Sequence, residues 1–138
     1  MDRPAGDRAR TAAQQAGDAA ETRVASHLIE RGWTVLARNV HVGRRELDLV
    51  TVDPGPPRRL VIVEVRWRRR RDFGLPEETV DHRKRRHLHE AAYALLGGAP
   101  LPDGTTAPAL PVRFDLVVVE PAASGTPEPR IRHHRAAF

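Results

Sequence analysis

The chain has 138 residues, 40% of them hydrophobic, which suits one ordinary domain and leaves too little length for two. Lysine and arginine total 23 against 18 aspartates and glutamates, and the net charge of +5 favours a polyanionic partner, although an arginine-rich surface without a binding role explains the same composition. Cysteine is absent, which excludes disulfides and thiolate metal sites and makes a cytoplasmic location the expected one.

Residues 1–15 are polar and charged, and they show little apolar periodicity. We expect a flexible leader here, because the segment lacks both an apolar face and the apolar centre of a signal peptide. Residues 16–138 are then expected to form a single folded domain. No apolar run approaches the length of a membrane span, so no membrane partner is expected.

Apolar periodicity predicts two helices and four or five strands in the folded part. Val24, Ala25 and Leu28 recur at helical spacing. Gly32 and Gly97 supply the stops of the two helices. In chain order, the predicted elements are a helix at 17–31, strands at 33–40, 47–52 and 60–67, a helix at 77–96, a strand at 112–119 and a short edge strand at 130–134.

The strand at 60–67 is the expected centre of the fold. Its residues 60–63 are all apolar, as a strand buried on both faces requires. The order of one helix, three strands, a second helix and one or two further strands predicts an α/β fold in which helices cover the sheet.

Three predicted elements each direct one acidic side chain toward the core. Helical spacing places Glu21 on the apolar stripe of the first helix. Strand alternation places Asp48 on the same face as Val50. It also places Glu64 on the same face as Ile62. A buried carboxylate is costly unless it is paired with a cation, protonated or bound to a metal ion, so these acids need a compensating partner.

Carboxylate oxygens are the ligands that Mg²⁺ and Mn²⁺ prefer, and such ions promote phosphodiester cleavage by activating water and neutralising phosphate charge. Ion pairs with neighbouring arginines would explain any one of the three acids taken alone. Three acids that converge favour a metal-dependent site instead.

Several motifs between residues 17 and 138 resemble those of a known family. The motifs are Gly17-Asp-Ala-Ala-Glu21, Gly32-Trp-Thr-Val-Leu-Ala-Arg-Asn39, Glu46-Leu-Asp-Leu-Val50, Val63-Glu-Val-Arg66, Phe73-Gly-Leu-Pro76, Val80 with Lys84, Arg113-Phe-Asp-Leu116 and His133-His-Arg-Ala-Ala-Phe138. On these motifs the chain resembles the YraN-like family, which is related to Holliday-junction resolvases and to the wider PD-(D/E)XK nuclease superfamily. The resemblance implies a restriction-endonuclease-like core, a mixed sheet flanked by helices in the order α-β-β-β-α-β.

The same resemblance implies roles for individual residues. In the superfamily pattern, Asp48 and Glu64 are the two metal-binding acids, and Glu21 is the helix glutamate of resolvase-like members. Arg66 stands where the catalytic lysine belongs, and a permanently charged arginine orients phosphate but does not relay a proton at ordinary pH. Catalysis is therefore left open, with two hypotheses: a Mg²⁺- or Mn²⁺-dependent endonuclease acting on branched or damaged DNA, and an inactive DNA-binding or adaptor protein that retains the nuclease fold.

Lys84 is the candidate to replace the missing catalytic lysine. It lies four residues after Val80 and four before Leu88, on the inward stripe of the second helix. From there it can pair with Glu64 or Asp48 and supply a tunable positive charge. The alternative is that its side chain only extends past the apolar stripe to solvent.

Two basic clusters are expected to flank the acids and to contact phosphates without recognising a sequence. One continues from the third strand and the other occupies the second helix, where a solvated helix face is the alternative interpretation. The clusters consist of Arg68, Arg69, Arg70 and Arg71, and of Arg83, Arg85 and Arg86. DNA is the expected partner; resolvase-like relatives act as dimers, which leaves a homodimer open, but no motif specifies an interface.

Aromatic residues and the terminal histidines are assigned structural roles. Trp33 and Trp67 are expected to pack against the core or the sheet rather than to stack on bases. His133 and His134 lack a metal-ligand spacing and are expected at the surface.

Overall fold

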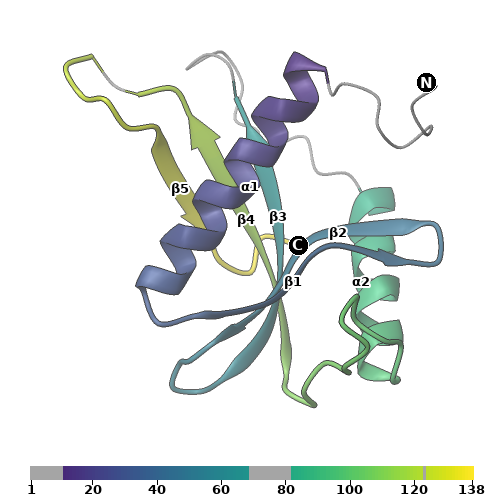
Figure 1. Ribbon diagram of the computed structural model, residues 1–138. Coiled ribbons are helices and arrows are strands. Elements are labelled where there is room, and N and C mark those ends of the chain that lie inside the picture. Colours follow the sequence, from purple (N-terminus) through teal and green to yellow (C-terminus); the bar gives the residue numbers. More distant parts are fainter. Residues whose placement is uncertain (1–10, 69–81, 123) are drawn as a thin grey trace.

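The computed structural model of the chain describes residues 11–68, 82–122 and 124–138 (Figure 1). Its elements are α1 (Ala12–Glu30), β1 (Thr34–Val42), β2 (Arg45–Asp53), β3 (Arg59–Trp67), α2 (His82–Leu96), β4 (Val112–Glu120) and β5 (Arg130–His134). This order confirms the predicted α/β fold, with the short fifth strand present. Among these residues, no helix combines the length and the apolar character needed to cross a membrane.

The five strands form one mixed sheet in the order β1-β2-β3-β4-β5. β2 runs antiparallel to both β1 and β3, whereas β4 lies parallel to β3 and β5 returns antiparallel to β4. The parallel pair follows from the position of α2 in the chain, because a parallel neighbour requires a crossover connection.

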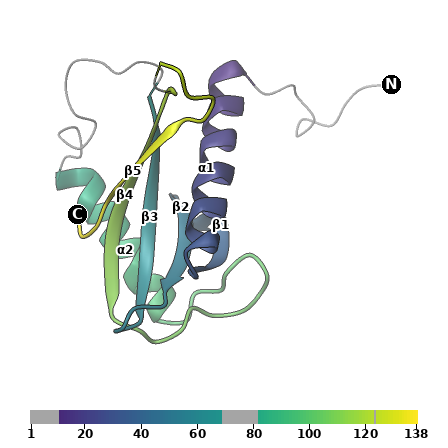
Figure 2. The same cartoon turned by 90° about the vertical axis from the view of Figure 1, so that its left-hand side faces the viewer.

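The two helices cover opposite faces of the sheet, so the core has two layers (Figure 2). Alternation along β3 divides its apolar residues between them: Val61 and Val63 pack under α1, and Leu60 and Ile62 pack under α2. The expectation that this strand is buried on both faces is therefore confirmed.

Helix α1 begins at Ala12, earlier than the predicted start at residue 17. Thr11 caps it: the hydroxyl Oγ1 of Thr11 accepts the Gln14 N–H at 3.1 Å, and Oε1 of Gln14 accepts the Thr11 N–H at 2.8 Å. Residues 12–15, which the sequence analysis assigns to the leader, are thus helical, because this reciprocal cap and a run of alanines start the helix before its apolar stripe begins. Residues 1–10 lie outside the described part of the chain.

The β1–β2 hairpin is longer than predicted, with Val42 opposite Arg45 beside the turn. Gly43 occupies this turn with a positive φ of 63°, a conformation that side chains other than glycine rarely adopt. The extension brings Arg45 to α2, where it forms an ion pair with Glu90. The hairpin is thereby held against the second helix. The predicted start of that helix, at 77–81, lies outside the described residues.

Candidate functional site

The candidate site begins where β2 and β3 separate. Their pairing ends at Leu49 opposite Val63, so Asp48 and Glu64 are the next residues on the two diverging strands. The Asp48 carboxylate lies in the gap and accepts the Val65 N–H at Oδ2, 2.9 Å away. A side chain thus replaces the backbone acceptor that continued pairing would have supplied, and it holds both acids at the same end of the sheet.

The pKa of Asp48 is raised to about 8, first by burial and then by the negative charges of Glu64 and Glu21. A hydrogen bond with Glu64 adds to this rise in the Asp48 pKa, whereas the Val65 N–H opposes it. At pH 7 the Asp48 carboxyl is therefore mostly protonated, and the two acids share a hydrogen bond instead of repelling each other.

Glu21 brings a third carboxyl to this place from the buried face of α1, next to Ala20 and Val24. Burial raises its pKa, and nearby acids including Glu64 add to the effect against the lowering influence of Arg38. Within the described residues, its buried Oε1 has no hydrogen-bond partner. A buried acceptor without a donor is costly, so Glu21 needs a proton or a cation.

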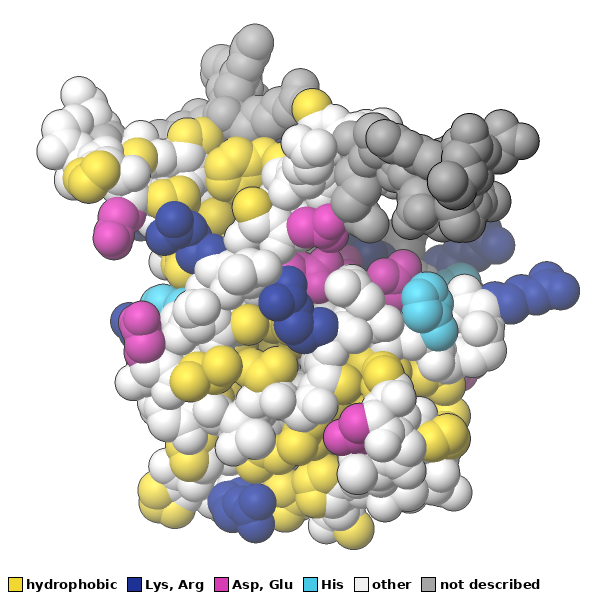
Figure 3. All heavy atoms as spheres, viewed as in Figure 1, with side chains coloured by type: hydrophobic (Ala, Val, Ile, Leu, Met, Phe, Trp, Pro, Cys, Tyr) yellow, Lys and Arg dark blue, Asp and Glu magenta, His cyan; other side chains and the backbone are white. Residues whose placement is uncertain are grey.

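Lys84 enters the site from the first turn of α2. Its Nζ forms an ion pair with Oε1 of Glu64, whose side chain is only 8% exposed. The prediction that Lys84 reaches these acids is confirmed, and the alternative in which it only passes to solvent is wrong. The space-filling view shows acidic side chains gathered between α1 and α2 (Figure 3).

A groove of about 700 Å³ adjoins the acids and separates the β1–β2 turn from the start of α2. Basic side chains from both elements line it, namely Arg44, Arg45, Arg83, Lys84 and His87. Arg44 and Arg45 are not among the predicted phosphate-binding residues. The available signal was their position beside Gly43, which marks a hairpin turn that presents both arginines together.

The remaining basic residues of the prediction are only partly gathered here. Arg66 lies half-buried on β3, two residues beyond Glu64 and on the same face by strand alternation. Arg68 is half-buried just after the strand, and its N–H donates to the Val119 carbonyl. Arg85 and Arg86 are exposed on α2, outside the lining of the groove. Residues 69–71 lie outside the described part of the chain.

The three acids have the donor chemistry that Mg²⁺ or Mn²⁺ requires, because all three offer carboxylate oxygens and one oxygen of Glu21 is buried without a donor. In the present arrangement Lys84 pairs with Glu64 and Asp48 holds a proton, and no three described acids or histidines are spaced as a preformed metal cluster. The residue types fit the ion, and binding would require the Asp48 proton to leave.

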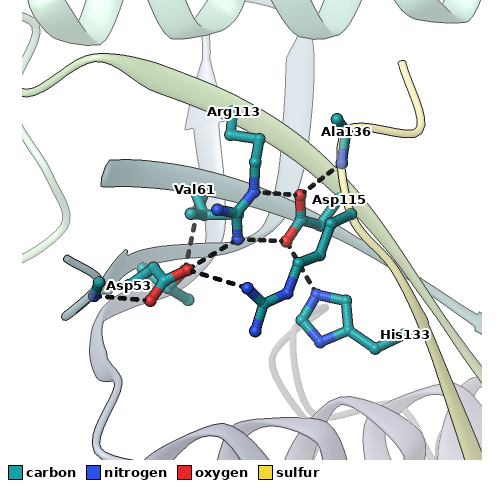
Figure 4. A network of polar contacts seen from close by, with 9 residues as sticks. Asp53, Val61, Arg113, Asp115, His133 and Ala136 are labelled. Carbon is teal, nitrogen blue, oxygen red and sulfur yellow. Dashed lines mark hydrogen bonds and ion pairs between the residues drawn. The ribbon is translucent and has the colours of Figure 1, made fainter. Parts of the chain in front are cut away.

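A second buried polar cluster, which the sequence analysis missed, lies at the other end of β2 (Figure 4). Arg113 donates to both carboxylate oxygens of Asp115 at 2.8 and 2.9 Å and to Oδ2 of Asp53 at 2.9 Å. Asp115 also contacts His133 Nε2 at 2.8 Å and accepts the Ala136 N–H at 3.0 Å. The expectation that His133 is a surface residue is wrong, because Asp115 holds its ring at the sheet. Arg113 and Asp115 are two residues apart on an apolar strand, which was the signal for a same-face ion pair.

Comparison with known proteins identifies the family. The model of "Uncharacterised protein family UPF0102" matches residues 20–119, a range that contains the whole acidic site. A UPF0102 protein of Xanthomonas euvesicatoria is 43% identical over 127 residues, which cover 92% of this chain and 93% of the relative. UPF0102 proteins of Symbiobacterium thermophilum and Porphyromonas gingivalis are 38% and 39% identical over 115 and 112 residues, covering 81% of this chain in both cases and 87% and 75% of the relatives. The chain therefore belongs to the UPF0102 family.

Proposed function

We propose that this chain is a nuclease-like DNA-binding protein of the cytoplasm whose acids Glu21, Asp48 and Glu64 hold Mg²⁺ or Mn²⁺ at a phosphodiester. The observation that carries the proposal is the convergence of three carboxyls from α1, β2 and β3, two of them with a raised pKa, beside a basic groove. Raised carboxyl pKa values caused by burial and by like charges are typical of functional sites.

A structural role explains these acids less well. Structural carboxylates are normally satisfied by arginine or by backbone donors, as Asp115 is. At the acidic site, Glu21 Oε1 has no donor among the described residues, and Asp48 is balanced by a proton. A divalent cation would compensate all three carboxyls at once, which favours a binding role.

The groove supplies the contacts that a nucleic acid requires. Arg44 and Arg45 approach from the hairpin, and Arg83 and Lys84 approach from α2, so cations line both sides. Such a groove attracts the phosphate backbone and leaves the bases unread. The groove meets the acids at Lys84, which places a bound phosphate next to them.

The acidic and basic residues of this site have separate proposed roles. Asp48 and Glu64 would hold the ion, and Glu21 would complete its shell of oxygen donors. The ion, when bound, would activate water and neutralise phosphate charge. Lys84 supplies a positive charge beside Glu64, and Arg66 binds phosphate oxygens as a permanent cation. The resemblance to PD-(D/E)XK nucleases supports the same assignment of the acids.

DNA binding without cleavage is the second candidate function. The observation that favours it is that the charges of two acids are already compensated: Lys84 pairs with Glu64, and a proton neutralises Asp48. The arginine at position 66 agrees with a protein that has kept the fold and lost the reaction. In that case the groove would be the functional surface.

Cleavage assays with the full chain separate the two functions. Branched, single-stranded and duplex DNA are incubated with Mg²⁺, with Mn²⁺ and with a chelator. Metal-dependent cleavage by the wild type that Asp48→Asn and Glu64→Gln abolish supports the nuclease. Glu30→Gln removes an exposed acid at the far end of α1 and should cleave like the wild type. Cleavage that survives in Asp48→Asn contradicts the metal site, and DNA binding without any cleavage supports the second candidate.

Salt dependence tests the groove itself. DNA affinity should fall steeply as salt rises, because each phosphate contact releases counterions. For each contact, the logarithm of the binding constant falls by about 0.9 per tenfold rise in salt concentration. The test variant replaces with glutamine two exposed arginines that line the groove, Arg44 and Arg83. The matched control replaces two exposed arginines elsewhere, Arg23 and Arg130. Anisotropy titrations should show a shallower slope for the first variant alone, and equal slopes would remove the groove from the interface.

A further inference from the structure

A second concave surface lies at the opposite end of β2 from the acidic site. It has a volume of about 650 Å³ and is formed by the end of α1, the β2–β3 turn, the start of β4 and the C-terminal tail. This size falls within the range of roughly 300–1,000 Å³ that small-ligand pockets occupy. Its chemically active lining residues are Arg31, Trp33, Asp53, Arg59, Arg113 and Arg135.

Positive charge dominates this pocket. Among the described residues that line it, Asp53 is the only acid, and its carboxylate already accepts hydrogen bonds. Its carboxylate accepts the Gly55 N–H at 2.9 Å and a hydrogen bond from Arg113 at 2.9 Å. Arg113 in turn is balanced by Asp53 and by Asp115 behind it. Four arginines thus face two acids, Asp53 and Asp115, and the pocket keeps a net positive charge.

Trp33 organises two of the guanidinium groups. The guanidinium carbon Cζ of Arg113 lies 5.6 Å from the centre of the indole ring, and that of Arg135 lies 5.8 Å from it. Cation–π contact of this kind restricts long side chains that would otherwise sample many rotamers. Arg135 remains 63% exposed and lies 3.8 Å from Asp53, so it is anchored yet still accessible. Pre-organised donors lose less entropy when a ligand binds.

We propose that this pocket binds a phosphate group, carried either by a free nucleotide or by a nucleic-acid strand. Several guanidinium groups around one cavity suit a ligand with more than one negative charge and several acceptor oxygens, which distinguishes phosphate from a carboxylate. The pocket shares no lining residue with the basic groove beside the acids. The inference is therefore independent of the metal site and would survive its failure.

Trp33 provides a direct reporter of binding. The chain has two tryptophans, so a Trp67→Phe background leaves Trp33 as the single one. Fluorescence of this full-length variant is titrated with inorganic phosphate, with adenosine monophosphate, and with a short single-stranded oligonucleotide that carries or lacks a 5′ phosphate. We expect a saturable change in Trp33 fluorescence with at least one phosphate-bearing probe.

Substitutions then assign the response to this pocket. In the Trp67→Phe background, the test variant replaces Arg31, Arg59 and Arg135 with glutamine. The control replaces Arg23, Arg58 and Arg130, which removes the same charge from exposed positions that line neither this pocket nor the basic groove. Affinity should fall by about tenfold or more in the test variant and change little in the control, because each lost charge-assisted hydrogen bond weakens binding strongly. Arg113 stays intact because the buried Asp115 depends on it, and the single variant Arg135→Gln, at an exposed position, replaces the triple variant if that one does not fold.

Each outcome of the titrations decides a point. A response to inorganic phosphate or to the mononucleotide supports a small-ligand site. A response confined to oligonucleotides supports a second contact with a nucleic-acid strand, and dependence on the 5′ phosphate would identify a strand end. No response to any probe, or equal weakening in the test and control variants, overturns the proposal.

Discussion

Asp48 lies near the middle of β2 and Asp53 ends the strand, and burial opposes ionisation of both, yet their pKa values move in opposite directions. The pKa of Asp48 rises to about 8, because its carboxyl is buried and lies near the negative charges of Glu64 and Glu21. Burial also acts to raise the pKa of Asp53, but the Gly55 N–H and Arg113 outweigh it and lower that pKa below its usual range. The partners of a buried acid, and not burial alone, decide whether it is charged.

The difference separates a structural cluster from a candidate functional one. Around Asp115, nearly every polar atom has a matched donor or acceptor, and the result ties β4 to β5 and to the C-terminal tail. Around Asp48, like charges are brought together and one oxygen of Glu21 is left without a donor in the described structure. An arrangement that works against folding is expected where a ligand supplies the missing charge.

The largest effect is expected at Lys84, the cation of the acidic site. Replacing it with methionine keeps an unbranched side chain that is one atom shorter and removes the ion pair with Glu64. If the wild type cleaves DNA in a metal-dependent way, Lys84→Met should lower the rate by about a hundredfold or more, because a positioned charge or proton donor contributes on this scale. Arg85→Met, at an exposed neighbouring position, is the control.

Arg66→Lys complements that experiment. It should preserve or increase cleavage, because it restores a tunable amine at the strand position. Unchanged cleavage in Lys84→Met would show that the function has not moved from strand to helix. Cleavage that appears only in Arg66→Lys would identify the wild type as a lapsed nuclease and establish the binding function in its place.

Removing one charge from the structural cluster should lower the free energy of unfolding more than any change at the acidic site does. Asp115 is fully buried and bonded to Arg113, His133 and the Ala136 N–H. Asp115→Asn leaves Arg113 with less compensation, and we expect the free energy of unfolding in urea to fall by about 3 kcal/mol. Glu128→Gln, at an exposed position, serves as the control and should change it little. A loss no larger than that of the control would contradict the structural assignment.

In the metal-free protein, Asp48→Asn should instead raise the free energy of unfolding. The folded pKa of about 8 lies above the ordinary value of 3.8, so the folded state binds the proton more tightly and wild-type stability declines as pH rises between these values. Asparagine keeps an oxygen for the Val65 N–H and removes the charge. We expect the variant to be more stable than the wild type by at least about 1 kcal/mol at pH 9 and by much less at pH 5. Equal effects at both pH values, measured by urea unfolding, would show that Asp48 is not the group that titrates.

The order of elements could be predicted from the sequence because each helix and strand has its own apolar period. Two boundaries could not. α1 starts at a cap formed by Thr11 and Gln14, which carries no apolar signal. The β1–β2 hairpin extends past its apolar residues, and an ion pair between Arg45 and Glu90, far apart in sequence, holds it to α2.

The acids of the candidate site could also be predicted, because each one interrupts an apolar face and is therefore recognisable in the sequence. The partner of Glu64 followed from the helical position of Lys84. In the structural cluster, the pair Arg113–Asp115 had a local signal, whereas the contact that joins Arg113 to Asp53, 60 residues away, had none, because no local period connects them. Its C-terminal member His133 resembles a surface residue until the sheet places it beside Asp115.

The smallest expected effect is a difference between the two clusters in how protein stability changes in acid. The pKa of Asp115 is lowered in the folded state, because the donors His133, Arg113 and the Ala136 N–H outweigh the effect of burial. A lowered pKa adds stability that is complete above the ordinary value of 3.8 and is lost as pH falls through the folded value. Wild-type stability should therefore decline as pH falls below the ordinary value of 3.8, measured as the urea midpoint at each pH. Asp115→Asn should flatten this decline while Asp48→Asn leaves it in place, because Asp48 is already protonated there. The same decline in both variants would show that acid instability arises elsewhere and that the contrast between the two clusters does not govern stability.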